Sequence, residues 1–172
     1  MPSVPNCHLP RGHTLLELMV ALTLVAILAT LAYPGFAALL LDSRRDAAVT
    51  TALHAVHAAR QFAAARGESM RLCGTRDAWH CSGEGDWSAG LLIVGSGDFV
   101  YRSLPLRSQG AGPDLHSNRP VISFEPGTSF ASPATVTICD RRGSSAARAI
   151  IVSRSSRPRV SERDASNRPL QC

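Results

Sequence analysis

The stretch RGHTLLELMVALTLVAILATLAYPGF, residues 11–36, is mostly apolar. No charged residue occurs from Leu18 to Leu41, and about 20 apolar residues are enough to span a bilayer as a helix. We therefore expect a membrane-spanning helix over residues 13–41. Glu17 stands at its start, although a charge inside a membrane helix costs about 2.5–3.5 kcal/mol and usually marks a function.

The helical pattern continues beyond the apolar run. Residues 42–67 are rich in alanine, and Gly67 is predicted to end the helix. This half is amphipathic and should pack against the domain that follows it. Pro34 is predicted to kink or locally unwind the apolar half. The stripe expected to face the domain is formed by Val49, Ala52, Leu53, Val56, Ala59 and Ala63.

Residues 68–172 show short apolar runs separated by Gly, Pro and Ser, which predicts a small antiparallel β domain and places the chain in the α+β class. Strands are expected at Leu91–Val94 and Phe99–Arg102, around the turn GSGD. Further strands are expected in RPVISFEP and ATVTICD, and a hairpin over 147–161. The stretch from Leu104 to Pro120 is predicted to be a loop.

Cysteine and arginine usage indicates the compartment. Arg11 is the one formal charge ahead of the apolar run, and arginine marks the cytoplasmic side, so the β domain should lie outside the cytoplasm. Four cysteines follow the membrane segment, which indicates two disulfides in an oxidising compartment. Three pairings are possible, and we favour the local one, Cys73–Cys81 with Cys139–Cys172.

No arrangement of residues predicts catalysis, a cofactor or a metal. Cys73, His80 and Cys81 could ligate zinc, but they lack the paired cysteine spacing of structural sites, and a disulfide is the better interpretation. No nucleophile, base and orienting acid occur in a recognisable spacing, so the protein is not expected to be an enzyme. Trp79 and Trp87, on either side of Cys81, are expected to cover the core.

The positive charge is concentrated at the C-terminal end. The formal net charge is +5, every basic residue is arginine, and the whole positive excess lies in residues 139–172. Such a segment suggests a polyanionic partner. Proline favours an extended conformation for the residue before it, so Arg157 and Arg159 should point to the same side, with Arg154 near the hairpin turn. Arginine can donate two hydrogen bonds to one phosphate.

The first segment resembles the class III signal of type IV prepilins and pseudopilins. The resemblance implies that a prepilin peptidase cuts between Gly12 and His13 and that the new amino terminus is methylated. Glu17 is then the family's glutamate, which pairs with a free amino terminus during filament assembly. Pro34 matches the proline that interrupts the family's helix, and His13 stands where the family usually has phenylalanine.

The C-terminal stretch CDRRG…ARAIIVSRSSRPRVS is similar to the end of FimT/GspH-type minor pilins. In the FimT branch a Gly-Arg-x-Arg motif binds DNA, and the matching residues here are Ser156, Arg157, Pro158 and Arg159. The resemblance implies binding of double-stranded DNA without sequence preference through Arg154, Arg157 and Arg159, assisted by Arg163 and Arg168. The Cys139–Cys172 bridge is expected to hold these arginines in place.

Together the resemblances imply a minor type IV pilin for DNA uptake in natural transformation. Its expected partners are other pilins or pseudopilins, the prepilin peptidase and DNA. It would be a single-pass inner-membrane protein with a periplasmic C-terminal domain, and later part of a pilus at the cell surface. The alternatives are a minor pseudopilin of a type II secretion system, and a minor pilin that only primes pilus assembly.

Overall fold

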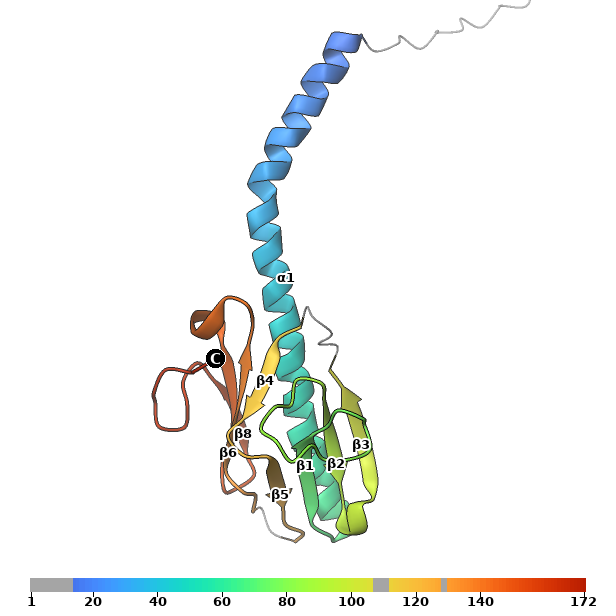
Figure 1. Cartoon of the computed structure of the whole chain (residues 1–172). Helices are drawn as coiled ribbons and strands as arrows, with labels where there is room; N and C mark the ends of the chain where they lie inside the picture. The colour runs from blue at the N-terminus through green and yellow to red at the C-terminus, as the bar shows by residue number, and fades with distance from the viewer. Residues whose placement is uncertain (1–13, 107–111, 128–129) are drawn as a thin grey trace, which may run out of the picture. The chain divides into compact units, whose positions relative to one another are not determined.

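The structure is a computed structural model that describes residues 14–106, 112–127 and 130–172. Gly12 and His13, on either side of the expected cleavage site, lie outside the described residues. The chain divides between Leu40 and Leu41 into two compact units, called unit 1 and unit 2 in chain order. The helix α1, Leu15–Arg66, contributes to both of them (Figure 1).

Both ends of α1 follow from local sequence. The hydroxyl oxygen of Thr14 accepts a hydrogen bond of 3.3 Å from the backbone N–H of Glu17, which is half of a Thr-x-x-Glu capping box. At the other end Gly67 has a φ of 67° and donates to the carbonyl of Ala63 at 3.1 Å. The helix stop predicted at Gly67 is confirmed, because glycine adopts this left-handed conformation without steric penalty.

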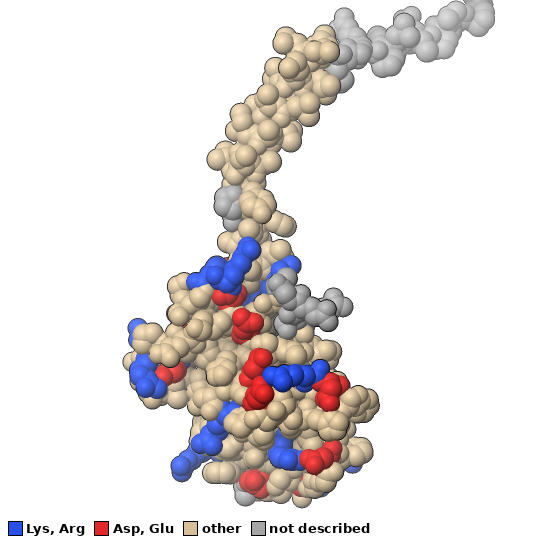
Figure 2. Space-filling view, viewed as in Figure 1, with Lys and Arg blue, Asp and Glu red and all other residues tan. Residues whose placement is uncertain are grey.

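The first unit exposes an apolar helix surface. Leu16, Leu22, Leu28 and Leu31 are all more than half exposed, and the visible surface of this helix segment is uncharged in Figure 2. By length and composition α1 can cross a membrane. The helix is continuous through Pro34, so the local unwinding predicted there is not found in the chain on its own. One proline removes a single i→i−4 hydrogen bond, and a long helix can absorb that by bending.

In the second unit α1 buries the alanine-rich stripe that its sequence predicts. Val56 and Ala59 are almost completely buried, and Leu53 lies half-buried at the edge of the stripe. Small side chains let sheets approach the helix closely. The stripe packs in one hydrophobic cluster with residues of both sheets, such as Ile93 and Ile150.

The β structure consists of two four-stranded antiparallel sheets. In the first sheet the order is β3-β2-β1-β5, and in the second it is β4-β6-β7-β8 (Figure 1). The strands of the first sheet are β1 Met70–Gly74, β2 Gly90–Val94, β3 Val100–Pro105 and β5 Val121–Phe124. The strands of the second are β4 Asp114–Ser117, β6 Ala134–Cys139, β7 Arg148–Val152 and β8 Pro158–Ser161.

Two strands differ from the sequence prediction. β4 lies inside the stretch predicted as a loop, and β1 was not predicted at all. β4 pairs with β6 and buries Leu115 and Ser117 in alternation. β1 lies between β2 and β5 and buries every residue except Arg71. Both strands are short and owe their conformation to pairing with distant strands, which local sequence does not specify.

The two tryptophans have opposite environments. Trp87 is 1% exposed and belongs to the core, as predicted, but Trp79 is 69% exposed. The prediction that Trp79 covers the core was therefore wrong. Asp77 accepts hydrogen bonds from the backbone N–H groups of Trp79 and His80, and this turn directs the Trp79 side chain into solvent.

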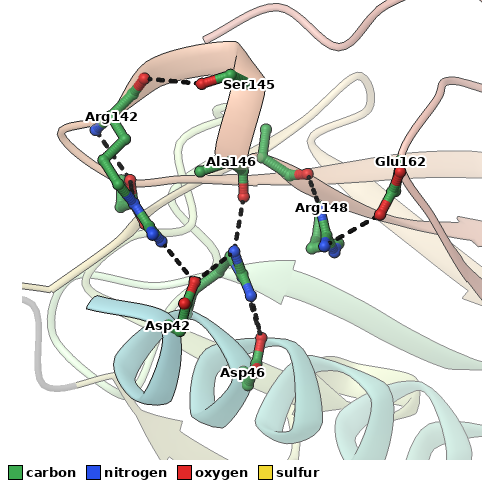
Figure 3. A network of polar contacts seen from close by, with 10 residues as sticks. Asp42, Asp46, Arg142, Ser145, Ala146, Arg148 and Glu162 are labelled. Atoms are coloured by element: carbon green, nitrogen blue, oxygen red, sulfur yellow. Dashed lines mark hydrogen bonds and ion pairs between the residues drawn. The ribbon is translucent and has the colours of Figure 1, made fainter. Parts of the chain in front are cut away.

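A network of ion pairs joins α1 to the connection between β6 and β7 (Figure 3). The Asp42 carboxylate lies 2.8 Å from the Arg142 guanidinium and 2.9 Å from that of Arg45. Arg142 also contacts Asp140 at 2.6 Å, and Arg45, itself buried, donates to the carbonyl of Ala146. Charged hydrogen bonds of this kind fix the β6–β7 connection of the second sheet against the helix.

Candidate nucleic-acid interface

The β7–β8 hairpin carries the arginines to which the sequence pointed. The backbone N–H of Ser153 donates to the carbonyl of Arg157 at 3.2 Å, and the N–H of Ser156 donates to the carbonyl of Ser153 at 3.0 Å. The hydroxyl of Ser153 also donates to the Arg157 carbonyl at 3.2 Å. These bonds close a tight turn that continues the β7–β8 ladder as far as Arg157.

Strand register places Arg157 and Arg159 on one face. Arg159 pairs with Ile151 of β7, which in turn pairs with Thr135 of β6. The neighbouring Ile150 and Val152 face the helical core, so Arg159 points to the opposite, outer face. Arg157 precedes it by two residues and shares that face. Both arginines are exposed, with Cα atoms roughly 6.5 Å apart, twice the rise per strand residue.

Ser156 occupies the glycine position of the DNA-binding motif and adopts a glycine-like conformation. Its φ is 49° and the residue is 1% exposed. An L-residue in this left-handed region costs roughly 1–2 kcal/mol relative to its preferred conformations. The replacement of glycine therefore keeps a tight turn, held by the hydrogen bond to Ser153.

Ion pairing separates the C-terminal arginines into two groups. Arg142 contacts Asp42 and Asp140, Arg148 lies 3.0 Å from Glu162, and Arg168 lies 2.8 Å from Asp164. The ion pairs of the described residues include no pair with Arg154, Arg157 or Arg159. These three remain available to an external anion.

Arg163 and Arg168, expected to assist, are used within their own loop. Arg163 donates to the carbonyl of Asn167 at 3.1 Å. The Asp164 carboxylate accepts hydrogen bonds from the backbone N–H of Arg168 and from its side chain. These two contacts, the backbone one first, hold the pKa of Asp164 below its usual range. The structure thus separates this loop from the three arginines of the hairpin.

The disulfides follow the favoured pairing, Cys73–Cys81 and Cys139–Cys172. The second bridge ties down the C-terminal segment, whose Leu170 is buried in a small cluster with Cys139, Ala147 and Ala149. The hairpin arginines are held by the β7 ladder instead. The expectation that the bridge holds all the arginines therefore applies only to the loop with Arg163 and Arg168.

A polar groove lies on the same outer face of the second sheet as the hairpin arginines. Its volume is about 590 Å³, and it runs between the second sheet and the C-terminal segment. Its wall includes Thr135, which shares a cross-strand row with Arg159 at a distance of about 10 Å, two strand spacings. His116, Thr137 and Arg168 line the groove further along. The outer face is therefore polar beyond the arginines themselves.

Comparison with known proteins identifies the family. The family model described as type II transport protein GspH matches residues 48–156, well over half of the chain. The chain belongs to the GspH family. A second model, the prokaryotic N-terminal methylation motif, matches residues 9–33. The protein is thus a minor pilin or pseudopilin of the GspH/FimT type, a family whose members assemble with other pilins after prepilin processing.

Solved structures show the same fold. Two crystal structures of the type IV minor pilin FimU of Pseudomonas aeruginosa match with a TM-score of 0.54, at 20% and 18% identity. Each match covers 77% of this chain, and 94% and 99% of the respective FimU chain. The predicted long helix on an antiparallel β domain is confirmed by this likeness. No curated protein matches the chain.

The GspH match ends at Ser156, immediately before the two arginines of the motif. The family assignment therefore rests on the helix and the sheets and does not extend to Arg157 and Arg159. Two neighbours of this hairpin were not predicted from the sequence: Arg60 on α1 and Phe130 before β6. Phe130 is 47% exposed, and no periodic pattern marked it.

Proposed function

We propose that this minor pilin binds extracellular double-stranded DNA through the β7–β8 hairpin, for uptake in natural transformation. The observation that supports this most strongly is the position of Arg157 and Arg159, side by side on the outer face and outside the ion pairs of the described residues. Each DNA strand carries one phosphate per roughly 3.4 Å of helix axis, and successive phosphates are further apart than this because the strand also winds around the axis. Two guanidinium groups with Cα atoms roughly 6.5 Å apart can therefore contact phosphates of one strand.

The expected binding mode is independent of sequence. Nothing in the hairpin resembles a helix or ribbon long enough to read base edges in the major groove. Contacts to phosphate alone give non-specific binding that weakens steeply with salt. Such binding suits capture of any extracellular DNA.

Assembly would follow the pathway of the family. We infer cleavage after Gly12, methylation of His13, insertion in the inner membrane with unit 2 in the periplasm, and incorporation into a pilus. Glu17 would then pair with the amino terminus of its own or a neighbouring subunit, because an unpaired carboxylate in an apolar filament core is costly. Pro34 would be the point where the helix can open in the filament.

The cellular test replaces Arg157 and Arg159 together with alanine. Pili should still assemble, because neither side chain contacts the core, while uptake of DNA and transformation should be lost. Normal transformation by this strain would contradict the proposal.

A second candidate is a minor pseudopilin of a type II secretion system, which the description of the matched GspH family favours. Under it, partner pseudopilins would bind unit 2 and DNA would not. Loss of secretion, with unchanged DNA uptake, after deletion of the gene would support this second function.

A further inference from the structure

A small cavity opens beside the turn of the arginine hairpin. Its volume is about 270 Å³, just below the range of about 300–1,000 Å³ typical of pockets for drug-sized ligands. Three segments of unit 2 form it: α1, the residues after β5, and the hairpin turn. The lining residues are Arg60, Ala63, Ala64, Phe124, Glu125, Gly127, Phe130 and Ser156.

Backbone hydrogen bonds fix this cavity to the hairpin. The N–H of Ala131 donates to the carbonyl of Arg154 at 2.9 Å, and the N–H of Glu125 donates to the carbonyl of Phe130 at 3.1 Å. Phe130 directly precedes Ala131, whose backbone is bonded to the hairpin turn, and the residue is 47% exposed. Ser156 contributes to the cavity and directly precedes Arg157.

The chemistry of the cavity combines an aromatic wall with a basic rim. Arg60 lines the cavity, and Arg154 belongs to the same hairpin turn as the lining residue Ser156. Both arginines are exposed, and neither takes part in an ion pair among the described residues. The one acidic residue of the lining, Glu125, accepts a hydrogen bond from the hydroxyl of Ser69 at 2.8 Å. Aromatic side chains in a positively charged groove are the combination that binds single-stranded nucleic acid, since every base can stack on an aromatic ring.

We propose that this cavity takes one unpaired base of a DNA strand, stacked on Phe130, while the neighbouring phosphates lie against Arg154 and Arg60. The inference rests on the proposed DNA-binding function and extends it to single-stranded overhangs and other single-stranded regions. Size supports this occupant: the cavity is too small for a base pair with its two sugars, whereas a single flat base fits.

The test compares two DNA probes on the full-length protein in a non-ionic detergent. One probe is a blunt duplex, and the other is a single-stranded oligothymidine of the same length. Phe130→Ala should weaken binding of the single strand by roughly 5- to 100-fold, which corresponds to the loss of one stacked base. Binding of the blunt duplex should change by less than about 2-fold, because paired bases cannot enter the cavity.

Phe130→Tyr is the matched control, because tyrosine keeps a stacking ring, and it should bind both probes like the parent. In a Phe130→Trp variant, oligothymidine should quench the fluorescence of the new tryptophan relative to the parent, which has Trp79 and Trp87. Equal weakening of both probes by Phe130→Ala, or unchanged binding of the single strand, would overturn the inference. Duplex binding that survives loss of Arg157 and Arg159 would instead overturn the proposed function, so the two failures are distinguishable.

Discussion

The backbone N–H of Ser156 donates a hydrogen bond of 3.0 Å to the carbonyl of Ser153. This bond closes the turn that leads Arg157 into β8. Ser156 makes it from a left-handed conformation, with a φ of 49°, although its side chain is buried. The geometry of the candidate DNA-binding hairpin therefore depends on a residue in a conformation that glycine adopts more readily.

Substitutions at Ser156 should show this dependence. Ser156→Val should lower the stability of unit 2 by at least about 1 kcal/mol, because a β-branched residue is an outlier in the left-handed region. Ser156→Gly should leave the stability close to that of the parent, since relief of strain offsets loss of the hydroxyl. Thermal unfolding measures both, and a Val variant as stable as the parent would show that the turn does not constrain this position.

The Cys139–Cys172 bridge should matter for stability more than for DNA binding. It closes a loop with a sequence separation of 33 residues, for which the chain-entropy model gives roughly 3–4 kcal/mol. The Cys139→Ser, Cys172→Ser variant should unfold at a lower temperature than the parent. At temperatures where the variant is still folded, it should bind DNA nearly as tightly as the parent, because the β7 ladder holds Arg157 and Arg159. A large loss of DNA binding in the folded variant would show that the C-terminal segment is part of the interface.

The ion-pair network around Arg142 should make unit 2 sensitive to acid. The Arg142 side chain is the first cause that lowers the pKa of both Asp42 and Asp140. A carboxylate whose pKa is lower in the folded state than in the unfolded state stabilises the folded state at pH values above its unfolded pKa, about 3.9. It loses that contribution as the pH falls through its folded-state pKa. The melting temperature should therefore drop between about pH 5 and pH 3.

Arg142→Met isolates this contribution. The variant should be less stable than the parent near neutral pH, but its melting temperature should fall less between about pH 5 and pH 3. The Asp77–His80 pair should contribute equally to the acid sensitivity of parent and variant. The pKa of Asp77 is also lowered, first by the His80 side chain, but Arg142 is not among the causes of that shift. Parallel pH curves for parent and variant would refute the role assigned to Asp42 and Asp140.

Glu17 has two explanations that a conservative substitution separates. Thr14 and Glu17 have the spacing of a capping box, and glutamine serves that motif as well as glutamate does. If charge pairing with the amino terminus drives assembly, both Glu17→Gln and Glu17→Ala should insert and be cleaved but enter pili poorly. Normal pilus incorporation of Glu17→Gln, measured by immunoblot of sheared pili, would assign Glu17 to helix capping alone.

Local sequence was sufficient to predict the features that depend on local chemistry. The apolar run, the alanine stripe and Gly67 specify α1, because helix periodicity and helix ends are properties of neighbouring residues. The same holds for the β7–β8 hairpin, where Arg157-Pro158-Arg159 favours an extended chain. The long helix and the two disulfides are found as predicted.

The features that the sequence did not predict depend on distant partners. β1 and β4 become strands because they pair with strands far along the chain, and the burial of Leu115 results from that pairing. The division of the arginines is also a tertiary property. The sequence alone does not distinguish Arg148 and Arg168 from Arg157. In the folded chain, however, strand register and loop conformation place an acidic residue beside each of the first two. The position of Phe130 beside the hairpin turn was not predicted for the same reason.

Duplex DNA binding measured as a function of salt tests whether the β7–β8 hairpin is the DNA-binding site. The full-length protein in non-ionic detergent should bind a blunt duplex with an affinity that falls steeply between about 50 and 200 mM salt. Arg157→Ala, Arg159→Ala should bind much more weakly, with a slope of log affinity against log salt reduced by about two, since each phosphate contact contributes roughly 0.9. The control Arg102→Ala, Arg141→Ala removes the same charge away from the hairpin and should behave like the parent. If both double variants weaken binding equally, or neither does, the claim that the β7–β8 hairpin binds DNA is contradicted.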